Sequence, residues 1–132
     1  MYLSKKLVIN MLAGCTLALA GGIANAADAN VSAALSHSDR PSGDADADER
    51  RKPGQVLAFA GLETGMDVLE LEAGGGYYTE ILSRSVGPSG SAILQHAPGF
   101  MGFVGDGIDL RTANNRLTNV TVSITQFDDL DA

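Results

Sequence analysis

The 132-residue sequence is poor in the side chains that usually build metal, redox and nucleophilic sites. It contains one cysteine and two histidines, and His37 and His96 stand far apart without spaced cysteine or carboxylate partners. This spacing argues against a metal site. No serine occupies the nucleophile turn of a hydrolase, and no combination of histidine and aspartate supports one. The absences therefore argue against a metalloprotein and against a hydrolase.

Positive charge is also scarce. Nine lysines and arginines face sixteen aspartates and glutamates, which gives a formal net charge of −7. Nucleic acids and anionic membranes attract proteins through basic surfaces. We therefore expect no nucleic-acid partner, and the acidity itself mainly favours solubility.

The first 26 residues have the layout of a removable export signal. Lys5 and Lys6 precede an apolar stretch that begins at Leu7, and residues 24–26 (Ala-Asn-Ala) offer a cleavage site between small residues. Cleavage there would leave 106 residues and a formal net charge of −9, because both lysines are removed. We therefore expect one small domain that is exported to the periplasm or secreted.

Two other interpretations of this segment remain open. Residues 12–15 (Leu-Ala-Gly-Cys) resemble the box at which bacterial lipoproteins are cleaved, and acylation of Cys15 would then anchor the protein to a membrane. The apolar residues after Cys15 favour the ordinary signal, since a lipoprotein usually turns polar there. A spanning helix needs ~20 apolar residues, and Asn10 and the glycines at 21–22 interrupt this run. If the signal is removed, the mature chain has no thiol for a disulfide, a nucleophile or a metal.

Residues 27–43 are rich in Ala, Ser, Asp and Asn, which predicts a flexible leader before a folded domain at 44–132. In the domain, acidic residues from Asp44 precede basic residues that end at Lys52, an order that a helix dipole favours and that predicts a solvated helix. Pro53 opens a second helix that ends at Gly61. Its predicted buried stripe consists of Val56, Leu57, Phe59 and Ala60.

Short apolar runs then alternate with helical patterns. The predicted order is strand 66–71, helix 77–86, turn 87–90, strand 91–95, loop 99–107, helix 108–117 and strand 120–124. Strands that alternate with helices predict an α/β fold with a doubly wound parallel sheet.

Three glycines, Gly74 to Gly76, directly follow the first strand. Glycines allow a sharp turn, and the helix that follows offers unpaired N–H groups to a negative or electron-rich ligand. A phosphate-binding P-loop is excluded in this sequence because its lysine pattern is missing. The dinucleotide pattern fits Gly74 and Gly76 but has Thr79 at its third glycine position. The alternative to a ligand-binding turn is a turn without a binding function, in which the glycines only relieve crowding between strand and helix.

Residues 68–79 (Val-Leu-Glu-Leu-Glu-Ala-Gly-Gly-Gly-Tyr-Tyr-Thr) resemble the first motif of class I S-adenosylmethionine-dependent methyltransferases. The sequence from Arg51 to Gly61 and the pair Gly65-Met66 are similar to a group of bacterial, often exported, members of that family. The resemblance extends from about Asp39 to Asp129. It implies a Rossmann-like fold with S-adenosylmethionine as the cofactor.

The resemblance also implies a set of cofactor-binding residues. Glu70 matches the acid that orients the amino end of the cofactor, and the glycines shape the turn around its amino-acid part. Gln95 stands where the family has an acid for the ribose hydroxyls. Asp128, with Asp129 as the alternative, stands where the family places an acid near the adenine. The implied residues are Glu70, Gly74, Gly75, Gly76, Gln95 and Asp128, and catalytic residues are not identified.

We expect other roles for three residues that lie near this set. Glu72 falls where the motif has its first glycine, so we expect it to narrow the turn and to add negative charge. Tyr77 and Tyr78 either edge the cofactor pocket or, as their spacing with Ile81 and Leu82 favours, pack in the core.

In the resembling family, the methyl-acceptor site and any base come from the fourth strand onward. The family's strand order, 3-2-1-4-5-7-6, would leave the strand 66–71 with an open apolar edge that favours self-association. We therefore expect the cofactor-binding half of a methyltransferase, with a Rossmann-like sheet truncated after the third strand and no catalysis alone. The alternatives are a non-enzymatic exported interaction module with a vestigial Rossmann-like sheet, and a dinucleotide-binding domain.

Overall fold

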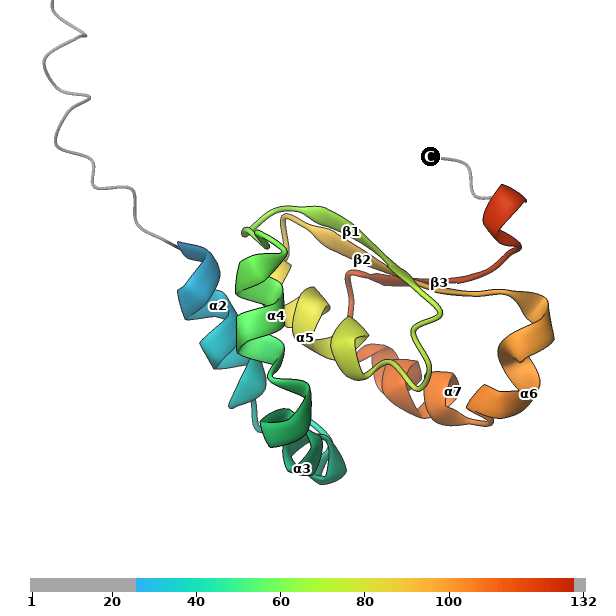
Figure 1. The fold of residues 1–132 in the computed structure, drawn as a ribbon, viewed down its shortest axis with the longest axis horizontal. Helices are drawn as coiled ribbons and strands as arrows, with labels where there is room; N and C mark the ends of the chain where they lie inside the picture. The colour runs from blue at the N-terminus through green and yellow to red at the C-terminus, as the bar shows by residue number, and fades with distance from the viewer. Residues whose placement is uncertain (1–25, 130–132) are drawn as a thin grey trace, which may run out of the picture.

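The computed structural model describes residues 26–129, which fold around a three-stranded parallel sheet (Figure 1). Most of the expected export signal, including Cys15, lies outside the described residues. Within residues 26–129, no helix is long and apolar enough to cross a membrane.

Three helices precede the sheet: α2 (Ala26–Leu35), α3 (Ser42–Arg51) and α4 (Pro53–Phe59). Helices α3 and α4 confirm the predicted pair. The prediction of a flexible leader over 27–43 is wrong, because α2 covers most of that segment and packs against α5. Val31 and Ala34 of α2 are buried in the core. Small alanine side chains allow α2 to lie close to its neighbour, and composition alone did not reveal this packing.

The predicted buried stripe of α4 is only partly correct. Leu57 is buried, but Val56 and Ala60 are exposed and Phe59 is 95% exposed. Helix α4 is anchored through Pro53 and Leu57, and its other apolar side chains face outward. The periodicity of a helix shows which residues share a face, but it does not show whether another element covers that face.

The sheet and its connections follow the predicted alternation of strands and helices. In chain order the elements are β1 (Asp67–Leu71), α5 (Tyr77–Val86), β2 (Ser91–His96), the 3-10 helix Pro98–Phe100, α6 (Met101–Val104), α7 (Gly107–Thr112), the 3-10 helix Ala113–Asn115, β3 (Val120–Ile124) and the 3-10 helix Phe127–Asp129. The predicted loop at 99–107 therefore contains short helical turns, and the predicted helix at 108–117 ends earlier as α7.

The strand order is β1-β2-β3, and both neighbouring pairs are parallel. In this register Leu69 lies beside Ile93, which in turn lies beside Thr121. The predicted α/β class with a Rossmann-like parallel sheet is confirmed. Within the described residues β1 is an edge strand, as expected, because it pairs with β2 alone.

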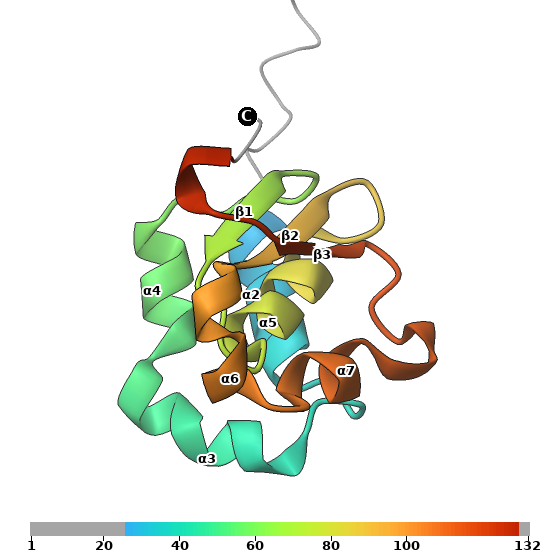
Figure 2. The same ribbon diagram turned by 90° about the vertical axis from the view of Figure 1, so that its right-hand side faces the viewer.

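Helices lie on one side of this sheet (Figures 1 and 2). Right-handed crossovers between strands that advance in one direction put both connections on the same face. The core on that face includes Leu57, Ile81, Leu82, Val86 and Ala92. On the opposite face Leu69 and Leu71 of β1 remain 45% and 53% exposed. The described sheet thus has one face covered by helices, and β1 and β3 are its two edge strands.

Candidate functional site

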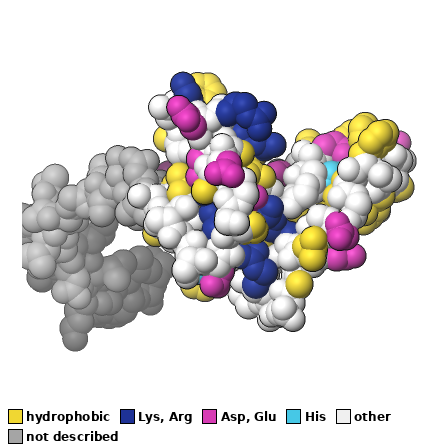
Figure 3. Space-filling view, turned by 90° about the horizontal axis from the view of Figure 1, so that it is seen from below, with side chains coloured by type: hydrophobic (Ala, Val, Ile, Leu, Met, Phe, Trp, Pro, Cys, Tyr) yellow, Lys and Arg dark blue, Asp and Glu magenta, His cyan; other side chains and the backbone are white. Residues whose placement is uncertain are grey.

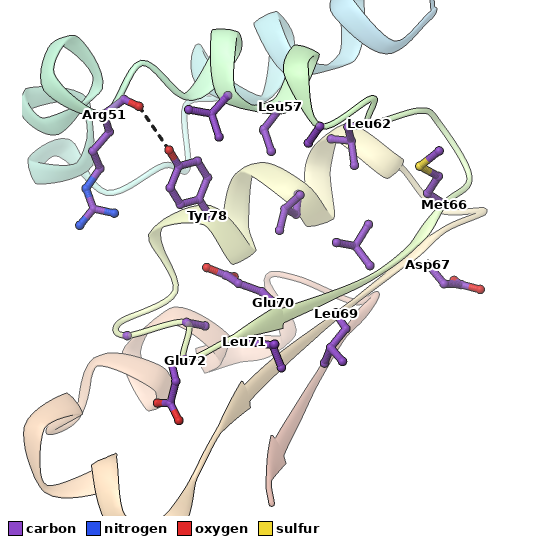
Figure 4. Close-up of a pocket in the computed structure, with 16 residues that line it drawn as sticks. Arg51, Leu57, Leu62, Met66, Asp67, Leu69, Glu70, Leu71, Glu72 and Tyr78 are labelled. Atoms are coloured by element: carbon purple, nitrogen blue, oxygen red, sulfur yellow. Dashed lines mark hydrogen bonds between the residues drawn. The ribbon is translucent and has the colours of Figure 1, made fainter. Parts of the chain in front are cut away.

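The carboxyl ends of the three parallel strands lie at the same edge of the sheet, where α/β folds bind their ligands. A cavity of about 700 Å³ runs beside β1 from Met66 to Gly74, and Figure 4 shows its lining. We call this cavity the β1 groove. Its other walls come from α4, through residues such as Leu57, and from Tyr78 of α5. The groove therefore joins the open edge of β1 to the start of the glycine turn.

Glu70 of β1 contributes a carboxylate to the groove, on the side of Tyr78 (Figure 4). The hydroxyl of Thr79 donates a hydrogen bond to Glu70 Oε2 at 2.5 Å. Burial raises the pKa of Glu70, and the Thr79 hydrogen bond opposes this shift. Within the described chain no lysine or arginine forms a salt bridge with Glu70. A partly buried carboxylate of this kind is suited to a cationic group of a ligand.

The glycine turn presents one of its glycines to the groove. Gly74 has a φ of +61°, lines the groove, and has no atom within 4 Å of the position that a Cβ would take. Gly76 has a φ of +77°, and a Cβ there would lie 2.9 Å from Arg111 Cγ. The carbonyl of Gly75 accepts a hydrogen bond from Arg111 Nε at 2.9 Å. Gly74 thus faces open space, while Gly75 and Gly76 hold the turn against Arg111 of α7.

Gln95 does not line the groove. It is fully buried at the end of β2, and its Nε2 donates to the carbonyl of Thr125 at 2.7 Å. Its Oε1 accepts from the backbone N–H of Glu72 at 3.3 Å. The Gln95 amide therefore joins the ends of the three strands, and both of its polar atoms already have protein partners.

Glu72 departs most from its expected place. Its φ of +50° is unusual for a residue with a side chain, and its carboxylate crosses to the end of β2. There Oε1 accepts from the N–H of Ala97 at 3.0 Å, and Oε2 lies 2.9 Å from His96 Nδ1. The Ala97 N–H and the His96 ring together hold the pKa of Glu72 below its usual value, against a smaller effect of burial. The expected crowding of the turn does not occur, because the carboxylate points away from it.

His96 is buried between two acceptors. Its Nε2 lies 3.1 Å from the carbonyl of Gly74, and its Nδ1 faces Glu72. Both contacts are hydrogen bonds at the same time only when both ring nitrogens carry protons. His96 therefore links the glycine turn to the Glu72 carboxylate. Within residues 26–129, no three His, Cys, Asp or Glu side chains come together in the manner of metal ligands.

The remaining predicted residues have separate places. Asp128 lies in the exposed 3-10 helix after β3 and is not part of the groove lining. Tyr77 is buried in the core, while Tyr78 lines the groove and donates from its hydroxyl to the carbonyl of Arg51 at 3.3 Å. The structure therefore brings Glu70, Glu72 and Gly74 to one cavity and leaves Gln95 and Asp128 outside its lining.

A buried ion network behind the turn was missed by sequence reasoning. Glu80 of α5 is fully buried, and its two oxygens accept hydrogen bonds from three arginines: Arg84, Arg111 and Arg116. Arg111 also pairs with Asp44 of α3 at 2.7 Å. A second pair joins Asp48 to Arg40. The prediction that the acids of α3 are simply solvated is therefore wrong for Asp44 and Asp48. Figure 3 shows basic and acidic side chains interspersed on one face of the molecule.

No protein-family model and no curated protein is significantly similar to this chain. Among solved structures, the chain is similar to an S-adenosylmethionine-dependent methyltransferase from Aquifex aeolicus, with 27% sequence identity and a TM-score of 0.50. The match covers 59% of this chain and 40% of that one. A protein-L-isoaspartate O-methyltransferase also matches, with 22% identity, a TM-score of 0.43, and coverage of 57% and 23%. The matched part is thus less than half of either relative, and the first match supports a Rossmann-like methyltransferase fold.

Proposed function

We propose that this chain is the cofactor-binding half of a class I methyltransferase and that S-adenosylmethionine binds at the carboxyl end of β1. One observation carries the proposal: Glu70 and the open Gly74 turn face the same cavity, at the sheet edge where such folds bind ligands. The Glu70 carboxylate would hold the amino group of the cofactor, and Gly74 would let its carboxylate approach the backbone. The bound cofactor supplies an activated methyl group.

The charge of the groove favours this ligand over a dinucleotide. Three acidic residues, Asp67, Glu70 and Glu72, line the groove against one basic residue, Arg51, and the same groove includes Gly74 of the turn that would hold a pyrophosphate in a dinucleotide domain. A pyrophosphate would be repelled there, whereas the ammonium and sulfonium of S-adenosylmethionine would be attracted. Thr79, at the position of the third dinucleotide glycine, is fully buried and bonded to Glu70. These contacts support a cationic ligand.

The described residues bind and orient the proposed ligand, and catalysis is expected to need more of the protein. Methyl transfer depends mainly on alignment, with a base added only when the acceptor requires one. The matched Aquifex structure extends well beyond the shared part, since that part is 40% of its chain. We therefore infer that the acceptor site lies outside residues 26–129 and that this chain alone does not transfer methyl groups.

Calorimetric titration of the full chain tests the proposal. S-adenosylmethionine and S-adenosylhomocysteine should each bind with measurable heat and should raise the unfolding temperature, because a ligand that binds only the folded state stabilises it. Titrations with nicotinamide and flavin dinucleotides serve as comparison and should give no heat. Absence of heat and of any thermal shift with millimolar S-adenosylmethionine would contradict the proposal, and binding of a dinucleotide instead would favour the alternative domain.

The export of this protein is proposed from residues 1–26 alone. We expect the mature protein, expressed in a bacterial host and recovered from the periplasm, to begin at Ala27. Mass spectrometry of the intact protein measures this directly. An acylated chain that begins at Cys15 would show a lipoprotein, and an intact chain in the cytoplasm would contradict export.

The open edge of β1 is proposed to pair with a second copy of the chain. In an antiparallel pair of Asp67–Leu71 strands, Leu69 lies opposite Leu69, and Asp67 lies opposite Leu71, so no like charges oppose one another. We expect a concentration-dependent dimer by analytical ultracentrifugation, and we expect Leu69→Lys to be monomeric because a lysine protects an edge strand. Phe103→Lys, at an exposed position on α6, is the matched control and should dimerise normally. A monomeric wild type would disprove the pairing.

A further inference from the structure

Glu72 carries a side chain at a position where the family motif has glycine. Glu72 has a φ of +50°, in the left-handed region that favours glycine, and holding a residue there costs about 1–2 kcal/mol. Contacts beyond the turn retain this conformation. The backbone N–H of Glu72 donates to Gln95, and its side chain receives hydrogen bonds at the end of β2. The carboxylate is therefore fixed at a chosen place and is not a mobile surface group.

That place is the carboxyl end of the second strand, where Rossmann-like folds use an acid to bind the ribose of a nucleotide. In this chain β2 ends in Gln95 and His96, and neither is an acid. Gln95 is fully buried, and both of its polar atoms are bonded to the protein. The negative charge at the end of β2 thus comes from Glu72, which belongs to the loop after β1.

The Glu72 carboxylate still has capacity for a ligand. A carboxylate has about four acceptor positions, and the Ala97 N–H and His96 Nδ1 occupy two. The side chain is 28% exposed, and Glu72 lines the β1 groove together with Glu70 and Gly74. Its two protein partners both act as donors. They hold the carboxylate ionised and in one orientation, which leaves the outer lone pairs free to accept hydroxyl hydrogens.

The two departures from the family pattern, a glutamate at position 72 and a glutamine at position 95, are structurally linked. Two adjacent carboxylates at the end of β2 would repel, and one at position 95 would be fully buried without a cation. An amide at position 95 avoids the repulsion, since its oxygen accepts from the Glu72 N–H and its nitrogen donates to Thr125. Gln95 is thus a positioning residue that supports Glu72.

From these contacts we propose that Glu72 binds the vicinal hydroxyls of the cofactor's ribose, the role that the resemblance to the methyltransferase family implied for Gln95. This inference rests on the proposed function, because it concerns the same groove and the same ligand. It assigns two carboxylates of the groove to different parts of that ligand: Glu70 to the ammonium and Glu72 to the diol.

Two ligands and two substitutions test the assignment by calorimetry. S-adenosylhomocysteine is compared with its 2′-deoxyribose analogue, which lacks one of the two hydroxyls. Wild type should bind the first ligand about tenfold more tightly, the size of one hydrogen bond to a charged group. Glu72→Gln and Glu72→Asn should bind both ligands alike. Asparagine tolerates the left-handed conformation, so Glu72→Asn keeps the local fold while removing the long carboxylate.

The control is Glu49→Gln, which changes an exposed acid of α3 that does not line the groove and should preserve the tenfold preference. If wild type binds both ligands with equal affinity, the assignment is wrong and the proposed cofactor site stands. If both Glu72 variants weaken the two ligands by the same factor, Glu72 has only a structural role. If wild type binds neither ligand, the proposed function fails and this assignment fails with it.

Discussion

Replacing Glu80 with glutamine should lower the free energy of unfolding by about 3–5 kcal/mol, the usual result of removing one partner from a buried ion network. Glu80 is fully buried and accepts hydrogen bonds of 2.7 Å from Arg116 and 2.8 Å from Arg111. Glutamine keeps the size of the side chain but has no charge, and its amide nitrogen would face arginine donors. Since a domain is stable by about 5–15 kcal/mol in total, this loss is a large fraction.

The same residue should make the protein sensitive to acid. Burial alone would raise the pKa of Glu80, but the hydrogen bonds from Arg116, Arg111 and Arg84 lower it to about 2, from an ordinary value of 4.5. A lowered folded-state pKa contributes stability that is fully present above about pH 4.5 and is lost as the pH falls toward 2. The contribution is about 3 kcal/mol by proton linkage.

Urea unfolding at pH 7 and at pH 3 measures both effects. Wild type should lose more stability than Glu80→Gln over this interval, because the variant has no carboxyl to protonate at position 80. Asp48 beside Arg40 also has a lowered pKa, but it is present in both proteins. The effect of Glu80 is therefore the difference between wild type and Glu80→Gln in the stability lost from pH 7 to pH 3. Glu49→Gln, an exposed residue of α3, is the control and should change stability by less than about 0.5 kcal/mol. A Glu80→Gln variant as stable as this control would disprove the network's role.

The strands and their order along the chain were predictable because each carries a local pattern. The alternating residues of β3 and the apolar run of β1 mark strands without knowledge of the rest of the fold. The packing of α2 was not predictable in this way. Its segment has small and polar side chains without an apolar stripe, and the burial of Ala34 depends on its contact with α5. Composition gave the wrong result there.

The residues of the candidate site likewise divide into those marked by a local sequence pattern and those brought together only by the fold. Glu70 and Gly74 were predicted because they stand in one short segment whose spacing has a direct physical use. The Glu72–His96 pair joins residues that are 24 positions apart, and it forms only because β1 and β2 end side by side. The Glu80 network likewise joins α5 to Arg111 and Arg116, which are 31 and 36 positions away. A weak signal was present in the sequence, since Glu72 and His96 each directly follow a predicted strand.

The last prediction concerns Gly74, which should be the most sensitive position for ligand binding. Phenylalanine at this position would project a ring into the open space beside Glu70, where no protein atom lies within 4 Å of the Cβ position. We expect Gly74→Phe to weaken S-adenosylhomocysteine binding by about 100-fold or more, equivalent to ~2.7 kcal/mol, because the ring would occupy the volume of the ligand. The positive φ of +61° should also cost about 1–2 kcal/mol of stability.

Gly61→Phe separates these two effects. Gly61 has a φ of +71°, also has no atom within 4 Å of its Cβ position, and does not line the groove. This variant should show the same backbone cost in urea unfolding but should bind the ligand as wild type does. If Gly74→Phe folds and binds with unchanged affinity, the turn only relieves crowding between β1 and α5. If the two variants lose affinity equally, the loss arises from destabilisation of the fold. Selective loss in Gly74→Phe would place the ligand against the Gly74 backbone, since both variants add the same ring at a glycine of positive φ and, of the two glycines, Gly74 lines the groove.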